Sequence, residues 1–235
     1  MNAGYYAERL GGTSLLRCYE LASPRVRQYL TAEVDFVVER LRPADVVLDL
    51  GCGYGRTLPD FARAAGFAVG IDTSETSLAL AAGRLADLRN VLLARMDAHR
   101  LAFVDGSFDT VICVQNGIAA FGADPRAVVR EAHRVLRPGG TAMFSSYAES
   151  FWEERLSWFE AQAAAGLIGP IDRRRTDAGV IVCTDGLVLG AVGPEEFAAL
   201  ATELDGEVCS TEVDGSCWFH LLRKGDRAEP AVSSG

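Results

Sequence analysis

The sequence predicts an α/β fold in which helices cover both faces of a mostly parallel sheet. From residue 45 onward, short apolar runs alternate with segments of helical spacing, a pattern typical of right-handed βαβ units. The strand-like runs are nearly all apolar, as expected when helices cover both faces. The chain has 235 residues and is 49% hydrophobic, which is enough for a well-buried core.

Five strands and three helices account for residues 45–147. The strands are expected at DVVLDL (45–50), FAVGID (67–72), NVLLARM (90–96), SFDTVICVQ (107–115) and TAMFSSY (141–147). The helices are expected at RTLPDFARAAG (56–66), SETSLALAAGRLADL (74–88) and DPRAVVREAHRVL (124–136). Ser74 and Asp124 are candidate N-caps, and Pro125 suits a first helical turn. The third helix is expected to stop at RPGG (137–140), before the fifth strand.

Further elements flank this core. A helical segment is expected before residue 42, and an amphipathic helix at ESFWEERLSWFEAQAAAG (149–166). Residues 180–192 predict a β-hairpin that turns at Asp185-Gly186, because Asp-Gly is a strong two-residue turn signal. A helix at 194–204 and two antiparallel strands around Asp214-Gly215 follow. The tail from Gly225 is small and polar, and we expect it to be disordered.

Charge and cysteine usage narrow the class of protein. The formal net charge is 23 − 32 = −9, which disfavours nucleic acid as a partner. The six cysteines form no CxxC pair and no zinc-like cluster, which favours reduced thiols in the cytoplasm and no metal site. Neither a signal peptide nor an apolar run of 18 residues is present, so we expect no membrane partner. The sequence does not determine the oligomeric state.

A glycine-rich turn follows the first strand, in VLDLGCGYGRT (47–57). Such a turn lets a ligand approach backbone N–H groups closely. The glycines are Gly51, Gly53 and Gly55, so the third stands one position early for the dinucleotide pattern G-x-G-x-x-G. Asp49 would repel a pyrophosphate in a low-dielectric cleft. The turn therefore favours a ligand that has no phosphate and carries a positive charge nearby.

Two further acids follow the next two strands. Asp72 ends the second strand, where a carboxylate can accept hydrogen bonds from both ribose hydroxyls. Asp97 follows the third strand and can accept a hydrogen bond from an adenine amino group, while the backbone of Ala98 can serve the ring nitrogen. S-adenosylmethionine combines adenine, ribose, an amino acid and a cationic sulfur without phosphate. It is the cofactor that these acids and the turn predict.

The chain resembles the class I S-adenosylmethionine-dependent methyltransferases of the small-molecule type. VLDLGCGYGR is similar to their first motif and VGIDTS to their ribose motif. RMDAHRLAFVDGSFDTVICVQN resembles the adenine and fourth-strand motifs, and EAHRVLRPGG the segment before the fifth strand. The motifs occur in order, and the resemblance covers about residues 35–150 and the closing GSCWFHLLRK.

This resemblance implies a Rossmann-like, seven-stranded, mostly parallel sheet whose last strand is antiparallel beside the fifth. It implies one methyltransferase domain over 1–235. We divide it into a helical N-terminal lid (1–42), a cofactor-binding core (43–150), a helix and hairpin cap insertion (151–193), a C-terminal helix and strand hairpin (194–224) and a tail (225–235). The cofactor residues carried over are Asp49, Gly51, Gly53, Gly55, Asp72 and Asp97. We also expect Thr73, Ala98, Gln115 and Tyr6 at the cofactor.

The acceptor side is expected over the carboxyl ends of the strands, as in other open α/β sheets. Its candidates are Tyr19, Asn116, Tyr147 and Arg175. Asn116 is followed by Gly-Ile and not by the Pro-Pro-aromatic sequence that marks amino-methylating DNA enzymes, which favours a small-molecule acceptor. The methylated atom and the general base are not identified. Two alternatives stay open: an NAD-dependent oxidoreductase on a related sheet, and a non-catalytic S-adenosylmethionine-binding regulator.

Overall fold

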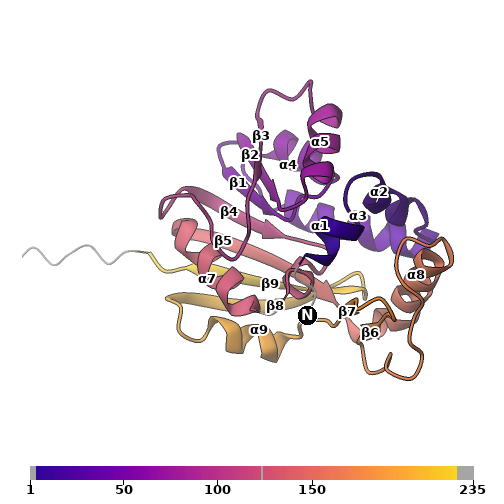
Figure 1. The fold of residues 1–235 in the computed structure, drawn as a ribbon. Helices are drawn as coiled ribbons and strands as arrows, with labels where there is room; N and C mark the ends of the chain where they lie inside the picture. Colours follow the sequence, from indigo (N-terminus) through magenta and orange to yellow (C-terminus); the bar gives the residue numbers. More distant parts are fainter. Residues whose placement is uncertain (1–3, 123, 227–235) are drawn as a thin grey trace, which may run out of the picture.

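A seven-stranded sheet forms the centre of the computed structural model, which describes residues 4–122 and 124–226 (Figure 1). The strand order is β3-β2-β1-β4-β5-β9-β8. The strands are β1 (Val46–Leu50), β2 (Phe67–Asp72), β3 (Val91–Arg95), β4 (Phe108–Cys113), β5 (Leu136–Tyr147), β8 (Gly206–Val213) and β9 (Cys217–Lys224). Strands β1 to β5 pair in parallel, while β9 is antiparallel to β5 and to β8. The predicted fold class is confirmed.

Helices cover both faces of this sheet. They are α1 (Tyr5–Arg9), α2 (Thr13–Glu20), α3 (Pro24–Val38), α4 (Leu58–Ala64), α5 (Glu75–Arg84), α6 (Gly117–Ala120), α7 (Pro125–Val135), the 3-10 turn η1 (Glu149–Phe151), α8 (Trp152–Ala164) and α9 (Pro194–Ala201). One buried cluster joins the sheet to α3, α4 and α5, and a second joins it to α7 and α9. Burial on both faces explains why the strands are nearly all apolar.

The predicted helix caps are present. The Ser74 hydroxyl accepts a hydrogen bond from the Ser77 N–H at 3.2 Å and caps α5. The Asp124 carboxylate accepts one from the Ala127 N–H at 3.0 Å and caps α7. Both helices therefore begin where the sequence predicts.

The start of β5 differs from the prediction. We expected the helix to stop at RPGG and the strand to begin at residue 141, but α7 ends at Val135 and β5 begins at Leu136. Leu136 pairs with Phe108, and after an irregularity Thr141 pairs with Thr110. Pro138 is tolerated there because it lies in the interrupted part of the ladder, where no regular hydrogen bond is lost.

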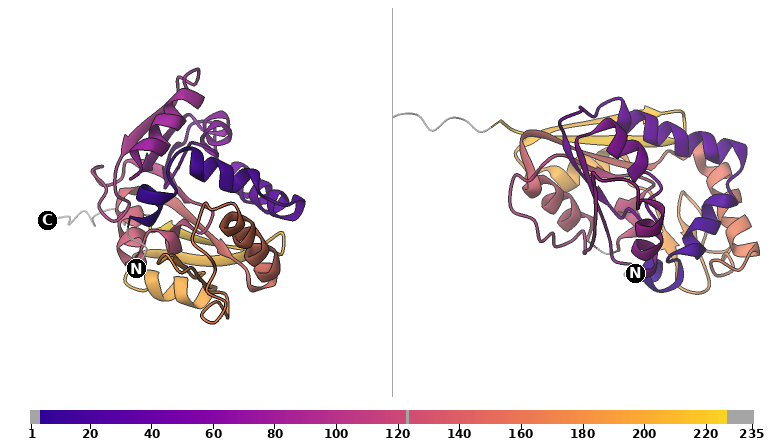
Figure 2. Two further views of the ribbon diagram at one scale, coloured as in Figure 1. Left: turned by 45° about the vertical axis from the view of Figure 1, so that its right-hand side comes forward. Right: turned by 90° about the horizontal axis from the view of Figure 1, so that it is seen from above.

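A third apolar cluster lies beside the sheet and joins α1, α2, α8 and the hairpin of β6 (Ile181–Val182) and β7 (Val188–Leu189). These segments lie together in all three views (Figures 1 and 2). The hairpin turns where the sequence predicts, with Gly186 at φ +101°. Tyr5 of α1 donates a 2.6 Å hydrogen bond to Asp185 in this turn. The N-terminal helices and the hairpin are thus linked across the site described below.

The predicted division of the domain stays a prediction. The expected disordered tail, 225–235, lies outside the described residues except for Gly225 and Asp226. Within the described ranges, every helix is too short or too polar to cross a membrane.

Candidate functional site

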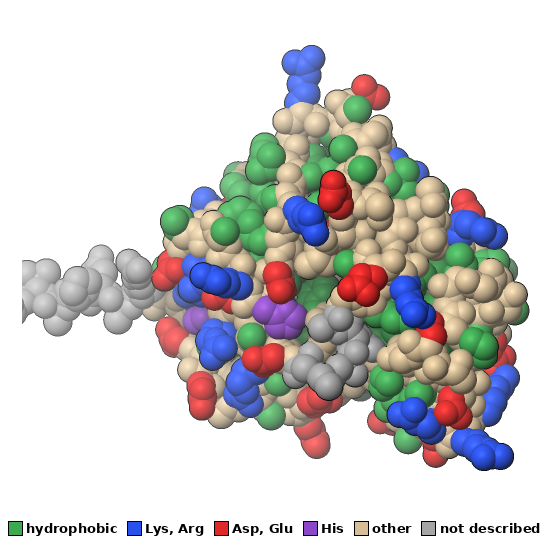
Figure 3. All heavy atoms as spheres, in the orientation of Figure 1, with side chains coloured by type: hydrophobic (Ala, Val, Ile, Leu, Met, Phe, Trp, Pro, Cys, Tyr) green, Lys and Arg blue, Asp and Glu red, His purple; other side chains and the backbone are tan. Residues whose placement is uncertain are grey.

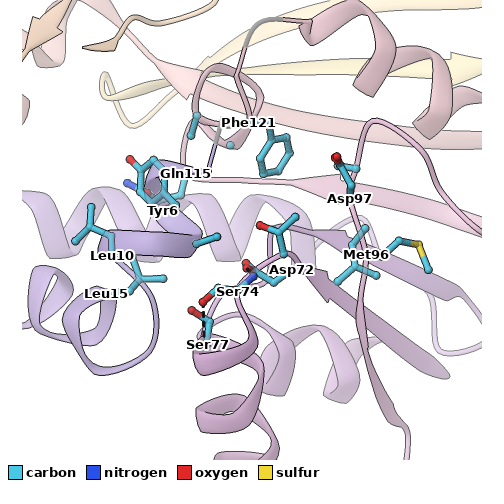
Figure 4. A pocket seen from close by; sticks show the side chains of 18 of the residues that line it. Tyr6, Leu10, Leu15, Asp72, Ser74, Ser77, Met96, Asp97, Gln115 and Phe121 are labelled. Carbon is cyan, nitrogen blue, oxygen red and sulfur yellow. Dashed lines mark hydrogen bonds between the residues drawn. The ribbon is translucent and has the colours of Figure 1, made fainter. Parts of the chain in front are cut away.

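A cavity of about 390 Å³ opens at the carboxyl ends of the parallel strands (Figures 3 and 4). In the space-filling view, apolar side chains lie inside a hollow on this face, with acidic side chains and a histidine nearby. The cavity is lined by loops after β1, β2, β3 and β4 and by residues of α1 and α2. Open α/β sheets bind their ligands at this edge.

The glycine turn forms the floor at the end of β1. Gly51, Gly53 and Gly55 have φ of +74°, +54° and +77°, in the region that favours glycine. Gly51 lines the cavity, and a Cβ there would lie 2.7 Å from the Phe121 ring. Gly53 and Gly55 are absent from the lining, and a Cβ on either would meet a leucine side chain. Of the three glycines, Gly51 is the one that lines the cavity.

Asp72 connects the end of β2 to the glycine turn. Its two oxygens accept hydrogen bonds from the Gly53 N–H at 2.9 Å and the Ser74 N–H at 2.7 Å. Burial raises the pKa of Asp72, against the opposing effect of these backbone hydrogen bonds. The carboxylate lines the cavity, and each oxygen keeps a second lone pair for a ligand (Figure 4).

Asp97 lies across the cavity from the glycine turn, after β3. Its Oδ1 accepts hydrogen bonds from the backbone N–H of His99 at 2.9 Å and pairs with His99 Nδ1 at 2.7 Å. Partial burial raises the pKa of Asp97, but the His99 contacts outweigh it, so the net pKa is lowered. Thr73, Ala98 and His99 also line the cavity. An ionised acceptor and a backbone edge are therefore available here.

Asp49 lies beneath the turn and does not line the cavity. The residue is 2% exposed, and its Oδ2 accepts a 2.8 Å hydrogen bond from the Thr57 hydroxyl. Burial raises the pKa of Asp49 to about 7, and the Thr57 bond and the charge of Arg56 limit the rise. Any effect of Asp49 on a ligand acts through the turn or through the electric field.

Gln115 and Asn116 follow β4 in left-handed conformations, with φ of 59° and 58°. Such angles are strained for non-glycine residues and persist only where neighbouring groups hold them. The Gln115 N–H donates to Glu33 Oε1 at 2.9 Å and to Ser145 Oγ at 2.8 Å. Ser145 Oγ also donates to Glu33. Buried groups from α3 and β5 therefore fix this segment.

The Gln115 side chain separates two cavities. Its Oε1 accepts a 3.1 Å hydrogen bond from the Tyr19 hydroxyl, and its Nε2 donates a 2.8 Å bond to the Tyr147 hydroxyl. Beyond it lies a smaller cavity of about 30 Å³. Both cavities share a set of lining residues: Tyr6, Leu10, Leu15, Tyr19, Gln115 and Ala120. They therefore adjoin, and Gln115 stands at their boundary.

The smaller cavity has an aromatic wall. Tyr6, Tyr19, Tyr147, Trp158 and Phe159 line it, from α1, α2, β5 and α8. The indole N–H of Trp158 donates to the Cys18 carbonyl at 2.8 Å, which fixes its ring. The wall thus presents ring surfaces to any molecule that enters.

Most of the sequence candidates lie at one or both cavities. The larger is lined by Tyr6, Tyr19, Gly51, Asp72, Thr73, Asp97, Ala98 and Gln115, and the smaller by Tyr6, Tyr19, Gln115, Asn116 and Tyr147. Arg175 is exposed and lines neither cavity, so we withdraw it as an acceptor-facing candidate. Its loop keeps the charge hydrated at the surface, as is usual for arginine.

Sequence reasoning missed two buried charged residues beside the smaller cavity. Glu33 is fully buried and Arg155 is 1% exposed. Each occupies the apolar stripe of its helix: Glu33 lies among Tyr29, Leu30 and Phe36 of α3, and Arg155 lies four residues before Phe159 of α8. A charged residue at an apolar-stripe position was the signal that could have identified both.

Comparison with known proteins identifies the class. Residues 47–140 match the family model of the methyltransferase domain. Over 148 residues the chain is 30% identical to 2-methyl-6-phytyl-1,4-hydroquinone methyltransferase of Synechocystis. The aligned stretch covers 56% of this chain and 46% of that enzyme. Residues 47–140 are therefore a methyltransferase domain, in agreement with the predicted resemblance to the class I S-adenosylmethionine-dependent methyltransferases.

Solved structures agree on the fold. The amino pentose methyltransferase CalS10 of Micromonospora echinaspora, solved with S-adenosylmethionine bound, has a TM-score of 0.57 at 20% identity, over 82% of this chain and 90% of that one. The [4+2]-cyclase SpnF has a TM-score of 0.60 at 18% identity, over 83% and 81%. The chain spans about half or less of the length of the first curated relatives that it matches, between 29% and 54%. The likeness to these solved structures shows the fold.

Proposed function

We propose that the protein transfers a methyl group from S-adenosylmethionine to a small organic acceptor by in-line displacement. The observation that carries the proposal is the composition of the larger cavity. Three aspartates, Asp72, Asp97 and Asp124, stand among its described lining residues, and no lysine or arginine does. A dinucleotide would bring a pyrophosphate into a cavity whose described lining holds no cation to offset it, whereas S-adenosylmethionine brings a sulfonium and an ammonium.

In this proposal each wall holds one part of the cofactor. Asp72 accepts hydrogen bonds from the ribose hydroxyls, and Asp97 with the Ala98 backbone holds the adenine. The amino acid part of the cofactor lies against the turn at Gly51. Asp49, beneath this turn, acts on it through its electric field. The bound cofactor supplies an activated methyl group, and the chain orients the acceptor and excludes water from it.

The acceptor enters on the far side of Gln115, where Tyr19, Asn116 and Tyr147 are the candidate contacts. The smaller cavity of about 30 Å³ has room for about one water molecule. An organic acceptor therefore needs α1 to move away from the hairpin. This supports the predicted role of the N-terminal helices as a lid.

Two alternatives make different predictions. An NAD-dependent oxidoreductase would have to hold a pyrophosphate without a lysine or arginine in the described cavity lining. A non-catalytic regulator would bind the cofactor without turning it over. The fold alone does not exclude other chemistry, since the neighbour SpnF is a cyclase.

A labelled-methyl assay tests the proposed reaction. The protein is incubated with methyl-labelled S-adenosylmethionine and, in parallel, with a metabolite extract or with total nucleic acid. We expect label in the small-molecule fraction only, because the −9 charge opposes polyanion binding. Label in nucleic acid would contradict the small-molecule acceptor. Cofactor binding without transfer to either fraction would favour the regulator.

We also propose a cytoplasmic location. All six cysteines, each within the described ranges, are free thiols, which is usual in reducing compartments.

A further inference from the structure

Two arginines lie over the rings of Tyr19 and Tyr147, the two tyrosines that Gln115 contacts by hydrogen bonds. The Arg56 guanidinium lies over the Tyr19 ring, 5.1 Å from its centroid. The Arg155 guanidinium lies over the Tyr147 ring at 4.3 Å. Both tyrosines line the smaller cavity and neither arginine does, so each of these rings has a cation against it outside the cavity lining.

Arg155 is buried without an acidic partner. No carboxylate of the described residues lies within 4 Å of its guanidinium nitrogens. Its Nη1 donates a hydrogen bond to the Gly179 carbonyl at 2.7 Å. Its Nη2 donates to the carbonyls of Leu189 and Gly190 at 2.9 and 3.0 Å. Its Nε–H is buried and makes no hydrogen bond. A buried cation whose charge is offset only by carbonyl dipoles is unfavourable unless another group compensates it.

Glu33 is an acid near this site, but its carboxyl group accepts hydrogen bonds from other residues. One oxygen accepts the bonds from Gln115 and Ser145, and the other is buried without a partner. Burial raises the pKa of Glu33, and the charge of Arg56 opposes that rise. Glu33 therefore lies within electrostatic reach of Arg56, whereas the side chains that act on Arg155 are tyrosines. Arg155 is thus the cation that has no acidic neighbour among the described residues.

The two adjoining cavities thus differ in charge. Three aspartates line the larger one, which suits a cationic cofactor. The smaller one has no Asp, Glu, Lys or Arg in its described lining, and the Arg155 guanidinium, which has no acidic partner, lies 4.3 Å from the centroid of its Tyr147 ring. In a low-dielectric cavity, this arrangement attracts an anion and repels an ammonium.

We propose that the methyl acceptor is an aromatic acid that carries its negative charge into the smaller cavity, toward Arg155. This inference rests on the proposed methyltransferase function and specifies its acceptor class. The aromatic wall supplies ring contacts for the acceptor. The positive field aligns its acidic group and excludes amines of the same shape.

Three probes of one shape test the charge preference: 4-hydroxybenzoate, 4-hydroxybenzamide and 4-hydroxybenzylamine. Each is titrated by calorimetry into the protein saturated with S-adenosylhomocysteine. We expect the anion to bind about tenfold or more tighter than the neutral amide, and the amine to bind weakest. Equal binding of the three, or no binding of the anion, overturns the proposal.

Two variants assign the preference to Arg155. Arg155→Met should reduce the ratio of anion to amide affinity to within about threefold, and Arg155→Lys should restore part of it. Arg173→Met is the matched control, because Arg173 is exposed and pairs with Glu160 on the same cap. The ratio is measured within each variant, so a general loss of affinity does not affect it. An unchanged ratio in Arg155→Met contradicts the role of Arg155, and if that variant does not fold, the wild-type ratio decides.

Failure of this inference is separable from failure of the proposed function. If S-adenosylhomocysteine does not bind, the proposed function is wrong. If it binds and the probes show no charge preference, only the acceptor class is wrong.

Discussion

The Asp49 carboxyl group lies under the glycine turn with little access to water. Its pKa of about 7 in the folded protein exceeds the ordinary value of 3.8. Between these values the unfolded chain loses a proton that the folded protein keeps. The contribution of Asp49 to stability is therefore fully present below pH 3.8 and is lost as the pH rises through 7.

Asp49→Asn removes this pH dependence. Between pH 5 and pH 8 the free energy of unfolding of the wild type should fall, relative to that of the variant, by about 2 to 3 kcal/mol. Urea unfolding at the two pH values measures the difference. Asp35→Asn, at an exposed acid on α3, is the control and should track the wild type. A parallel pH dependence in Asp49→Asn and the wild type would contradict the raised pKa.

Asp72 combines two roles, because it holds the Gly53 N–H and faces the cavity. Asp72→Ala should weaken S-adenosylmethionine binding by about 1.5–3 kcal/mol, the range for losing a charged hydrogen-bond partner. Calorimetry measures the change, and circular dichroism checks the fold. Glu75→Ala is the matched control, since Glu75 is an exposed acid three residues away that pairs with Arg95. Equal affinity in Asp72→Ala and the wild type would remove Asp72 from the site.

At the scale of elements, the segment 5–12, which includes α1, is held by hydrogen bonds on two sides of the larger cavity. On one side Tyr5 and Arg9 contact Asp185 in the hairpin turn, at 2.6 and 3.2 Å. On the other side the Gly12 N–H donates to the Ser77 hydroxyl of α5 at 2.9 Å. Opening the lid therefore requires breaking the contacts to Asp185 or those to α5.

Tyr5→Phe tests this fastening with little change in packing. The variant loses the hydrogen bond to Asp185 and keeps the ring, so amide exchange over residues 4–12 should accelerate about tenfold or more. S-adenosylhomocysteine should slow exchange in this segment in both proteins if the lid orders on binding. Thr202→Val is the control, because the Thr202 hydroxyl donates to the carbonyls of Ala198 and Ala199 in α9, far from the lid in the sequence. Exchange unchanged by both the variant and the ligand would make the segment a fixed wall.

The sequence predicts strands, helices and turns well where the signal is local. Ser74, Asp124 and the two Asp-Gly turns act through neighbouring backbone groups, and the structure has each of them. The start of β5 was missed because its pairing with Phe108 is a long-range contact. Local propensity carries no information about such a partner.

The residues of the site also fall into those that local sequence predicts and those that depend on long-range packing. Asp72, Asp97 and Gln115 could be predicted because each follows a strand, and the carboxyl ends of parallel strands meet at one edge. The positions of Arg155 and Glu33 could not, because they depend on how α8 and α3 pack against β5 and the hairpin. The position of Asp49 beneath the turn also depends on the backbone path, which the glycine pattern alone does not give.

Over the whole molecule, charge is distributed unevenly. The net charge is −9, and three of the aspartates that contribute to it line the larger cavity. Arg56 precedes α4 in the core and Arg155 lies in α8 of the cap, and each lies over a tyrosine ring of the smaller cavity. In our proposal the sheet edge provides an acidic cofactor site, and Arg155 gives the adjoining cavity the opposite polarity.

Calorimetric titration of the wild-type protein with S-adenosylmethionine, S-adenosylhomocysteine and NAD tests the central claim most directly. We expect the first two to bind with dissociation constants on the order of micromolar, about −8 kcal/mol. NAD should bind far more weakly, because the described cavity lining holds no lysine or arginine to offset its pyrophosphate. NAD binding as tight as that of S-adenosylmethionine would contradict the account.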